Sequence, residues 1–176
     1  MILLRCTPAQ WTLFFFAYSF LGWVWESSFV SLLEHRWVNR GFVWGPVLPI
    51  YGFGAVVILL FTLSAAHSPP LVFLLGMAGA SALEFFTGAL LNNLLHLRYW
   101  DYSAYRWNLG GYICLTASLC WGVFSLALVY LIHPVVDRLL RRVSPAAAVP
   151  IALLLTALLA VDFIAALHKV TPASTG

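Results

Sequence analysis

The sequence predicts an all-α integral membrane protein: a bundle of about five transmembrane helices with irregular interfacial loops rich in glycine, proline and aromatic residues. Of the 176 residues, 62% are hydrophobic and only 9% are charged, whereas soluble domains carry about 25% charged residues. No water-soluble fold can bury that much apolar surface. Windows of about 20 apolar residues recur, and each is long enough for a helix to cross a bilayer. We expect one transmembrane helical domain over residues 1–176.

Five apolar windows give the expected helices in chain order. They cover about residues 11–33, 46–65, 71–95, 112–132 and 146–167. The first window starts with a bulky aromatic run and lacks a small-residue cleavage site, so we interpret it as a retained helix and not as a signal peptide. Gly41 to Pro46 precedes the second window, and the aromatic segment Tyr99 to Gly111 precedes the fourth. A short basic connection, Asp137 to Arg142, separates the last two windows.

The lysines and arginines fall at the ends of the apolar windows, where cations reach the lipid headgroups. We therefore expect membrane lipids, and not nucleic acid, as partners. The two sides of a five-helix bundle carry four and five of these cations, which does not decide the orientation: Arg5, Arg138, Arg141 and Arg142 against Arg36, Arg40, Arg98, Arg106 and Lys169. The density of arginines at 138–142 favours a cytoplasmic N-terminal side.

No metal site or cofactor is expected from the sequence. Cys6, Cys114 and Cys120 have no paired spacing, so neither a disulfide framework nor a metal site follows from them. The histidines fall at helix ends, and no phosphate-binding G-x-x-x-x-G-K-[ST] motif occurs. The chain is therefore not expected to hydrolyse ATP by itself through that motif.

Two carboxylates, Glu26 and Glu84, lie well inside apolar windows. An acidic residue at the centre of a membrane helix costs about 2.5–3.5 kcal/mol even on insertion scales, so such residues usually face a cavity or a partner. We interpret both as candidates for a polar transport path. The alternative is that each merely holds helices together through hydrogen bonds. Asp162 and Lys169 lie near the end of the last window, where interfacial placement explains them.

The third window carries small and polar residues at every fourth position. Gly76, Ala80, Glu84, Gly88 and Asn92 form one ridge, and small residues let a neighbouring helix approach closely. Tyr18, Gly22 and Glu26 repeat this spacing in the first window. We predict that these two faces meet, that Gly22, Gly76, Ala80 and Gly88 are packing positions, and that Asn92 is a further candidate for the polar transport path.

Two irregular segments surround these carboxylates in the predicted topology. The first contains the candidate gate residues Gly45, Pro46, Pro49 and Gly52, and the second contains the candidate pocket residues Asp101, Tyr102 and Asn108. Non-helical backbone at membrane depth requires protein or a water-filled cavity to satisfy its polar groups. We therefore expect both segments to cover a polar pocket that has Glu84 at its base. An aromatic belt at the membrane interface is the alternative.

An ordered set of residues resembles the CmpB-type ABC-transporter (type IV) permease family. The resemblance rests on Gly22, Trp23, Glu26, Gly41, Gly45, Pro46, Tyr51, Gly52, Glu84, Trp100 to Ser103, Asn108, Gly111, Ile113 and Cys114. It covers roughly residues 11–142 and leaves helix 146–167 outside. It implies a transmembrane permease subunit powered by a separate ATPase chain, with polar positions at Glu26, Glu84, Asp101 and Asn108.

Three functions follow as hypotheses for this multi-pass protein of the cell membrane. The first is a permease-like subunit in which Glu26 and Glu84 line a polar path. The second is a membrane-embedded enzyme acting on a lipid or prenyl substrate, with Glu84 or Asp101 as general acid or base. The third is an assembly factor or homo-oligomer that uses the ridge of residues 76–92. The sequence leaves the substrate and the direction of transport open.

Overall fold

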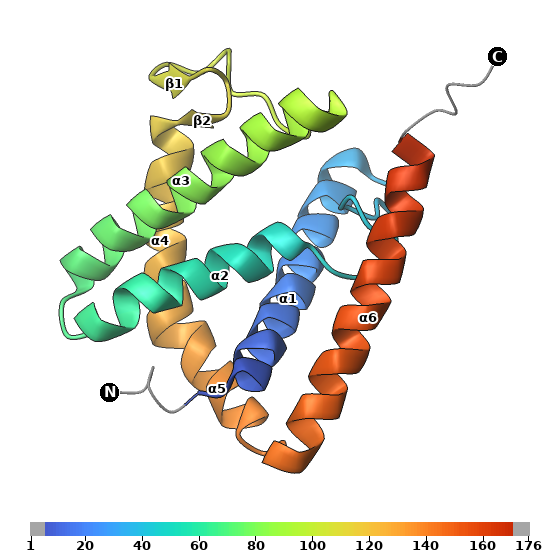
Figure 1. Cartoon of the computed structure of the whole chain (residues 1–176). Coiled ribbons are helices and arrows are strands. Elements are labelled where there is room, and N and C mark those ends of the chain that lie inside the picture. Colours follow the sequence, from blue (N-terminus) through green and yellow to red (C-terminus); the bar gives the residue numbers. More distant parts are fainter. Residues whose placement is uncertain (1–5, 171–176) are drawn as a thin grey trace. The chain divides into compact units, whose positions relative to one another are not determined.

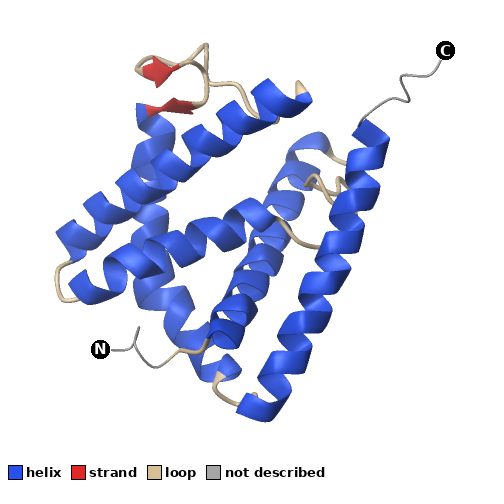
Figure 2. Cartoon of the chain, viewed as in Figure 1, coloured by secondary structure: helices blue, strands red, loops and turns tan. Residues whose placement is uncertain are grey.

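The computed structural model describes residues 6–170, which are almost entirely helical (Figures 1 and 2). Arg5, one of the cations counted for orientation, lies outside these residues. In chain order the elements are α1 (Pro8–Glu34), α2 (Pro49–Thr62), the 3₁₀ turn η2 (Leu63–Ala65), α3 (Pro69–Leu95), β1 (Asn108–Leu109), β2 (Ile113–Cys114), α4 (Leu115–Ala127), the π-helical turn η3 (Leu128–Ile132), α5 (His133–Leu140) and α6 (Pro145–Val170).

Local sequence signals set the ends of the two longest helices. At the start of α1 the Thr7 side chain accepts from the backbone N–H of Gln10, and the Gln10 side chain accepts from the Thr7 backbone, which satisfies two free donors of the first turn. Proline follows at the first position of both α1 and α3, where its missing N–H costs nothing. Both helices end at a left-handed histidine, His35 and His96.

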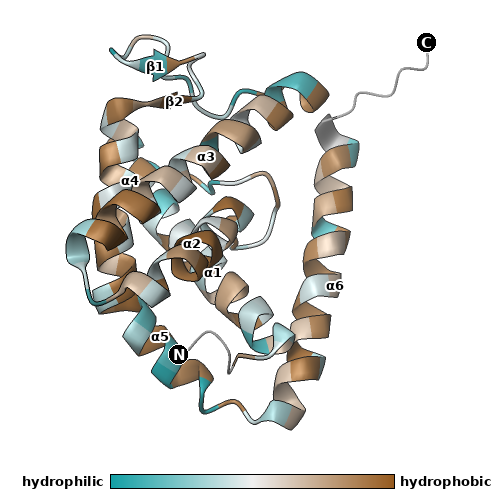
Figure 3. Cartoon of the chain, turned by 60° about the vertical axis from the view of Figure 1, so that its left-hand side comes forward, coloured by the Kyte–Doolittle hydropathy of each residue, from teal (hydrophilic) through white to brown (hydrophobic). Residues whose placement is uncertain are grey.

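Four helical segments of the described chain are long and apolar enough to cross a membrane. They are Pro8–Glu34, Pro69–Leu95, Leu115–Leu140 and Pro145–His168, and Pro49–Ala65 is a shorter apolar helix. Most of the α6 ribbon is brown in Figure 3, whereas teal residues gather on α5 and near β1. Large side chains such as Leu32, Leu153 and Val161 are about two-thirds or more exposed, as expected for surfaces that face lipid. The predicted all-α membrane class with about five apolar helices is confirmed.

Several predicted helix boundaries were displaced, and three of these shifts have a local structural reason. The second helix begins at Pro49 and not near residue 46, because Val47 N–H donates to the Gly45 carbonyl in a tight turn. The fourth begins at Leu115 and not near 112, because Asn108–Leu109 and Ile113–Cys114 pair as antiparallel strands. Its predicted end near 132 was also too early. The π-helical turn continues into α5, so the helix reaches Leu140.

The contacts divide the described chain into two compact units: Gly54–Val135, and Cys6–Phe53 with residues 136–170. In the first unit α3 packs along α4. A Cβ atom added to Gly76 would overlap Ser125, and one added to Gly122 would overlap the Phe73 ring. These two glycines therefore permit the close approach of the helices.

The second unit packs α1 against α6 around Leu13, Ala148 and Ala152. The first turns of α2 approach α1 closely, because a Cβ added to Gly22 would overlap Tyr51 and one added to Gly52 would overlap Ser19. The expectation of a single domain, and that of contact between the faces containing Gly22 and Gly76, stay predictions.

Candidate functional site

The Glu84 site consists of Glu84, Tyr102 and Trp121. Glu84 lies on α3 and is only 6% exposed. Tyr102 donates its phenol O–H to Oε1 at 3.0 Å, and Trp121 of α4 donates its indole N–H to Oε2 at 2.7 Å. Among the side chains described, those of residues 6–168, no cation forms an ion pair with this carboxylate. Both oxygens therefore accept hydrogen bonds, but their donors are neutral.

Small residues on α3 let other elements approach on the side that carries Glu84. Gly76, Ala80 and Gly88 are buried on this helix, as Glu84 is. A Cβ at Gly88 would lie 3.1 Å from the Tyr112 ring and 3.2 Å from the Trp100 ring. The predicted ridge therefore packs on α4 at one end and on the aromatic segment at the other, with Glu84 between them.

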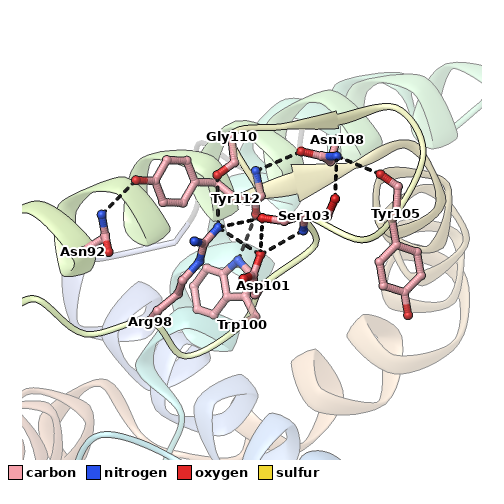
Figure 4. Close-up of polar contacts among 10 residues, drawn as sticks. Asn92, Arg98, Trp100, Asp101, Ser103, Tyr105, Asn108, Gly110 and Tyr112 are labelled. Carbon is pink, nitrogen blue, oxygen red and sulfur yellow. Dashed lines mark hydrogen bonds and ion pairs between the residues drawn. The ribbon is translucent and has the colours of Figure 1, made fainter.

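The segment between α3 and α4 is a loop that is held together by hydrogen bonds and an ion pair among its own polar side chains (Figure 4). The Asp101 carboxylate accepts from Ser103 N–H at 2.8 Å and from Ser103 O–H at 2.6 Å, and it pairs with Arg98 at 2.9 Å. Arg98 also donates to the Gly110 carbonyl at 3.1 Å. The Ser103 hydrogen bonds, with a smaller contribution from Arg98, hold the pKa of Asp101 below its usual value of 3.8.

Asn108 stabilises the second half of the same loop through hydrogen bonds (Figure 4). Its side-chain N–H donates to the Tyr105 carbonyl at 2.8 Å and to the Ser103 carbonyl at 3.3 Å, while its oxygen accepts from Gly111 N–H at 3.1 Å. Gly111 has a φ of +73°, and a side chain there would collide with Arg98 and Ser103. Asp101 and Asn108 thus stabilise the loop, and the hydrogen bonds to Glu84 come from Tyr102 and Trp121 instead.

The loop presents Tyr102 to Glu84. Tyr102 N–H donates to the Gly111 carbonyl at 2.9 Å, which fixes the backbone beside the ring. Burial raises the pKa of the Tyr102 phenol, and the neighbouring Glu84 charge raises it further. The phenol therefore keeps its proton near neutral pH and acts as a donor.

Asn92 belongs to a neighbouring contact and not to the Glu84 site. Its amide N–H donates to the Tyr112 hydroxyl at 3.1 Å (Figure 4). The Arg98 guanidinium lies over the Tyr112 ring, 5.7 Å from its centroid, a distance typical of cation–π contact. Asn92 therefore positions Tyr112, the residue that follows the loop glycines.

Glu26 lies in the second unit and has a cationic partner. Arg40 donates from both Nε and Nη2 to Oε1 at 3.1 Å, and Arg40 N–H donates to the Ser27 hydroxyl at 3.1 Å. The side chains are 26% and 35% exposed for Glu26 and Arg40. This pair ties the segment after α1 to that helix.

Asp162 is the residue that sequence reasoning missed. Its Oδ1 accepts from Trp44 N–H at 3.0 Å and its Oδ2 from Gly45 N–H at 2.8 Å. The carboxylate thus holds the irregular segment before α2, and interfacial placement does not describe its role. No local pattern could reveal partners over a hundred residues away. The one available signal was a carboxylate inside an apolar window, the argument already applied to Glu26 and Glu84.

The other gate candidates lie around this same contact or just after it. A Cβ at Gly45 would lie 3.0 Å from Asp162 Oδ2, Pro46 follows it, and Pro49 begins α2. Gly52 faces Ser19 of α1. Gly45 and Pro46 therefore lie in the turn beside α6, and Pro49 and Gly52 lie in the first turn of α2 beside α1.

The apolar spans and the carboxylates within them define a multi-pass helical membrane protein. Residues 13–167 match the family described as "Putative ABC-transporter type IV", and the chain belongs to this family. The match extends through most of α6, so limiting the resemblance to residues 11–142 was wrong. No curated protein and no solved structure matches the chain. The family description indicates a component of an ABC transporter.

Proposed function

We propose that this protein is the permease-like subunit of an ABC-type transporter in the cell membrane, energised by a separate ATPase chain. The observation that carries the proposal is the Glu84 site, a buried carboxylate inside an apolar helix with a neutral donor on each oxygen. Family membership supports the same function.

The depth of Glu84 supports a role beyond packing. It lies eleven positions before the end of α3, which is about 16 Å along a helix that rises 1.5 Å per residue, near the middle of about 30 Å of hydrocarbon. Ionisable residues at such depth usually mark ion or substrate pathways. The neutral donors Tyr102 and Trp121 stabilise the carboxylate without cancelling its charge, so a cationic or hydrogen-bond-donating group would find an acceptor there.

Glu26 takes a different place in the proposal. Its carboxylate is already paired with Arg40, so a transported cation would have to displace the guanidinium. We assign Glu84 to the position open to a transported group, and Glu26 to a paired position within its own unit. Asp101 and Asn108 support the path indirectly, because they hold the loop that presents Tyr102.

Purification tests whether the protein binds a separate ATPase chain. The tagged chain is extracted in gentle detergent and everything that remains bound is identified by mass spectrometry, with an unrelated multi-pass protein as control. We expect an ATPase chain in near-stoichiometric amount with this protein only. Recovery of the chain with lipids or further copies alone would remove the ABC-type energy source from the proposal.

Once the ATPase chain has been identified, transport measured in reconstituted vesicles tests the role of the Glu84 carboxylate. Glu84→Gln keeps the size of the side chain and an acceptor oxygen but removes the charge, and we expect transport to fall at least tenfold. Loss of one hydrogen bond to a charged group, about 1.5–3 kcal/mol, corresponds to that change. Glu34→Gln is the matched control, since Glu34 lies at the exposed end of α1. Equal transport by Glu84→Gln and the unmodified protein would exclude this role for Glu84.

A further inference from the structure

A groove in the second unit runs along α1 and α6, which lie side by side (Figure 1). Its volume is about 530 Å³, within the range of about 300–1,000 Å³ typical of small-molecule sites. The lining comes from α1, residues 45–47, the end of α5 and α6, and every lining side chain is apolar except that of Asp162. Both oxygens of Asp162 already accept backbone N–H groups. The groove therefore suits a hydrocarbon chain.

The length of the groove matches one leaflet. On α6 it is lined from Ile151 to Asp162, which is about 16 Å along the helix. A bilayer has about 30 Å of hydrocarbon, or about 15 Å for each leaflet. A single acyl chain that enters from the membrane surface would thus reach from the α5–α6 turn to the level of Asp162.

Positive charge lies at one end of the groove. Leu140 and Val143 line that end, and Arg141 and Arg142 lie between them in the chain. Arg141 pairs with Asp137 at 2.7 Å, whereas Arg138 and Arg142 are exposed and have no carboxylate partner among residues 6–170. At the other end lies the Asp162 carboxylate. An anionic headgroup is therefore attracted to the arginine end and repelled from the Asp162 end.

We propose that this groove is a specific site for an anionic phospholipid, with one acyl chain between α1 and α6 and the headgroup phosphate at the Arg138 to Arg142 turn. Basic pockets beside membrane helices bind anionic headgroups in this way. The test of this proposal is separate from the test of Glu84, because none of the groove residues belongs to the Glu84 site.

The test compares lipids that differ only in the headgroup. The purified full-length chain is mixed with phosphatidylglycerol or with phosphatidylcholine of the same acyl chains, and the retained lipid is counted by native mass spectrometry. We expect one phosphatidylglycerol molecule per chain and little phosphatidylcholine. Equal retention of the two lipids would overturn the preference for an anionic headgroup.

Two variants with matched controls locate the bound lipid. Each arginine near an anionic group contributes roughly fivefold in affinity, so Arg142→Gln is expected to lower phosphatidylglycerol retention about fivefold while Arg36→Gln leaves it unchanged. Leu155→Trp fills the groove and should abolish retention, whereas Leu153→Trp, at a position 67% exposed on the same helix, should not. Equal effects within either pair would overturn the proposed site, and Arg142→Gln tests it without any change in the packed helices.

Discussion

Three carboxylates inside the apolar helices are each stabilised by a different kind of donor. Glu26 meets the Arg40 guanidinium, Glu84 meets the side-chain donors Tyr102 and Trp121, and Asp162 meets two backbone N–H groups. A buried charge without such donors would cost several kcal/mol. The type of donor separates the roles, since a guanidinium cancels the charge and neutral donors do not.

We expect Asp162→Asn to destabilise the turn at Trp44 and Gly45. An asparagine keeps one acceptor oxygen, and its amide nitrogen would face the second backbone N–H, leaving that donor unpaired. An unpaired donor costs about 1–3 kcal/mol, and the partial exposure of this turn places the loss near 1 kcal/mol. Hydrogen exchange at the amides of residues 44 and 45 measures the effect. Thr156→Ala is the control, because the Thr156 hydroxyl bonds only within α6.

Protonation of Asp101 should destabilise the loop between α3 and α4, which this carboxylate holds together. The pKa of Asp101 is lowered in the folded loop by Ser103 and Arg98, so folding favours the ionised form. The contribution of this carboxylate is therefore fully present above its ordinary pKa of 3.8 and is lost as the pH falls through the lower folded value. We expect amide protection at residues 103 and 111, corrected for intrinsic exchange, to hold from pH 7 to 5 and to fall only below 3.8.

The variant Asp101→Asn separates this effect from general acid unfolding. In this variant the amide protection of residues 103 and 111 should already be low at pH 7. Lowering the pH should then cause no further loss that depends on side chain 101. The control Glu34→Gln should exchange as the unmodified protein does. Protection that is equal in Asp101→Asn and the unmodified protein at pH 7 would contradict the role of the carboxylate.

Sequence reasoning found the buried residue Glu84 but not its donor Trp121. A carboxylate in an apolar window is visible from composition, because its cost does not depend on the neighbours. Its partners are 18 and 37 residues away. The fold of the loop brings Tyr102 to it, and the packing of α3 on α4 brings Trp121. Tyr102 was named as a pocket residue, whereas Trp121 looked like any aromatic residue of an apolar helix.

At the scale of the element, every helix start was located within three residues of its expected position. Thr7 with Gln10, and Pro69 with Pro70, are the local signals at two of these starts. The start at Leu115 was expected three residues too early, near 112, because the short pairing of residues 108–109 with 113–114 competes with the helix. The continuation through η3 to Leu140 was missed because the polar residues His133 and Asp137 suggested a loop, although a helix accommodates both.

The close contact of α3 with α4 predicts the effect of Gly76→Ala. The added methyl group would overlap Ser125, and overpacking typically costs about 1–3 kcal/mol. We expect a loss of that size in the free energy of unfolding in detergent, recovered in part by Ser125→Gly. Gly79→Ala on the same helix is the control, since its methyl group would meet Val57 at an ordinary 3.4 Å. Equal changes at the two glycines would mean that the Ser125 contact does not set the cost, since helix propensity favours alanine at both positions.

At the scale of the whole molecule, the short helix Pro49–Ala65 decides the topology. It covers about 25 Å at 1.5 Å per residue, slightly less than about 30 Å of hydrocarbon. If it spans, residues 36 and 101 lie on one side of the membrane and residue 141 on the other. We expect this arrangement, because five spans alternate the sides.

Single cysteines at positions 36, 101 and 141, after replacement of Cys6, Cys114 and Cys120, test this with a reagent that does not cross membranes. Labelling of 36 and 101 from one side and of 141 from the other supports five spans. Labelling of 36 and 101 from opposite sides would show that Pro49–Ala65 dips into the membrane and returns.

The bond from Asp162 to Trp44 also orders events during synthesis. The two residues are 118 positions apart, and ribosomes add about 5–20 residues per second. For roughly 6–24 s after Trp44 and Gly45 are made, their final acceptor does not yet exist, at the translation rates just given. Water or the insertion machinery must solvate these two amides during that interval. The segment before α2 therefore reaches its final form only when α6 has been made and has packed beside α1.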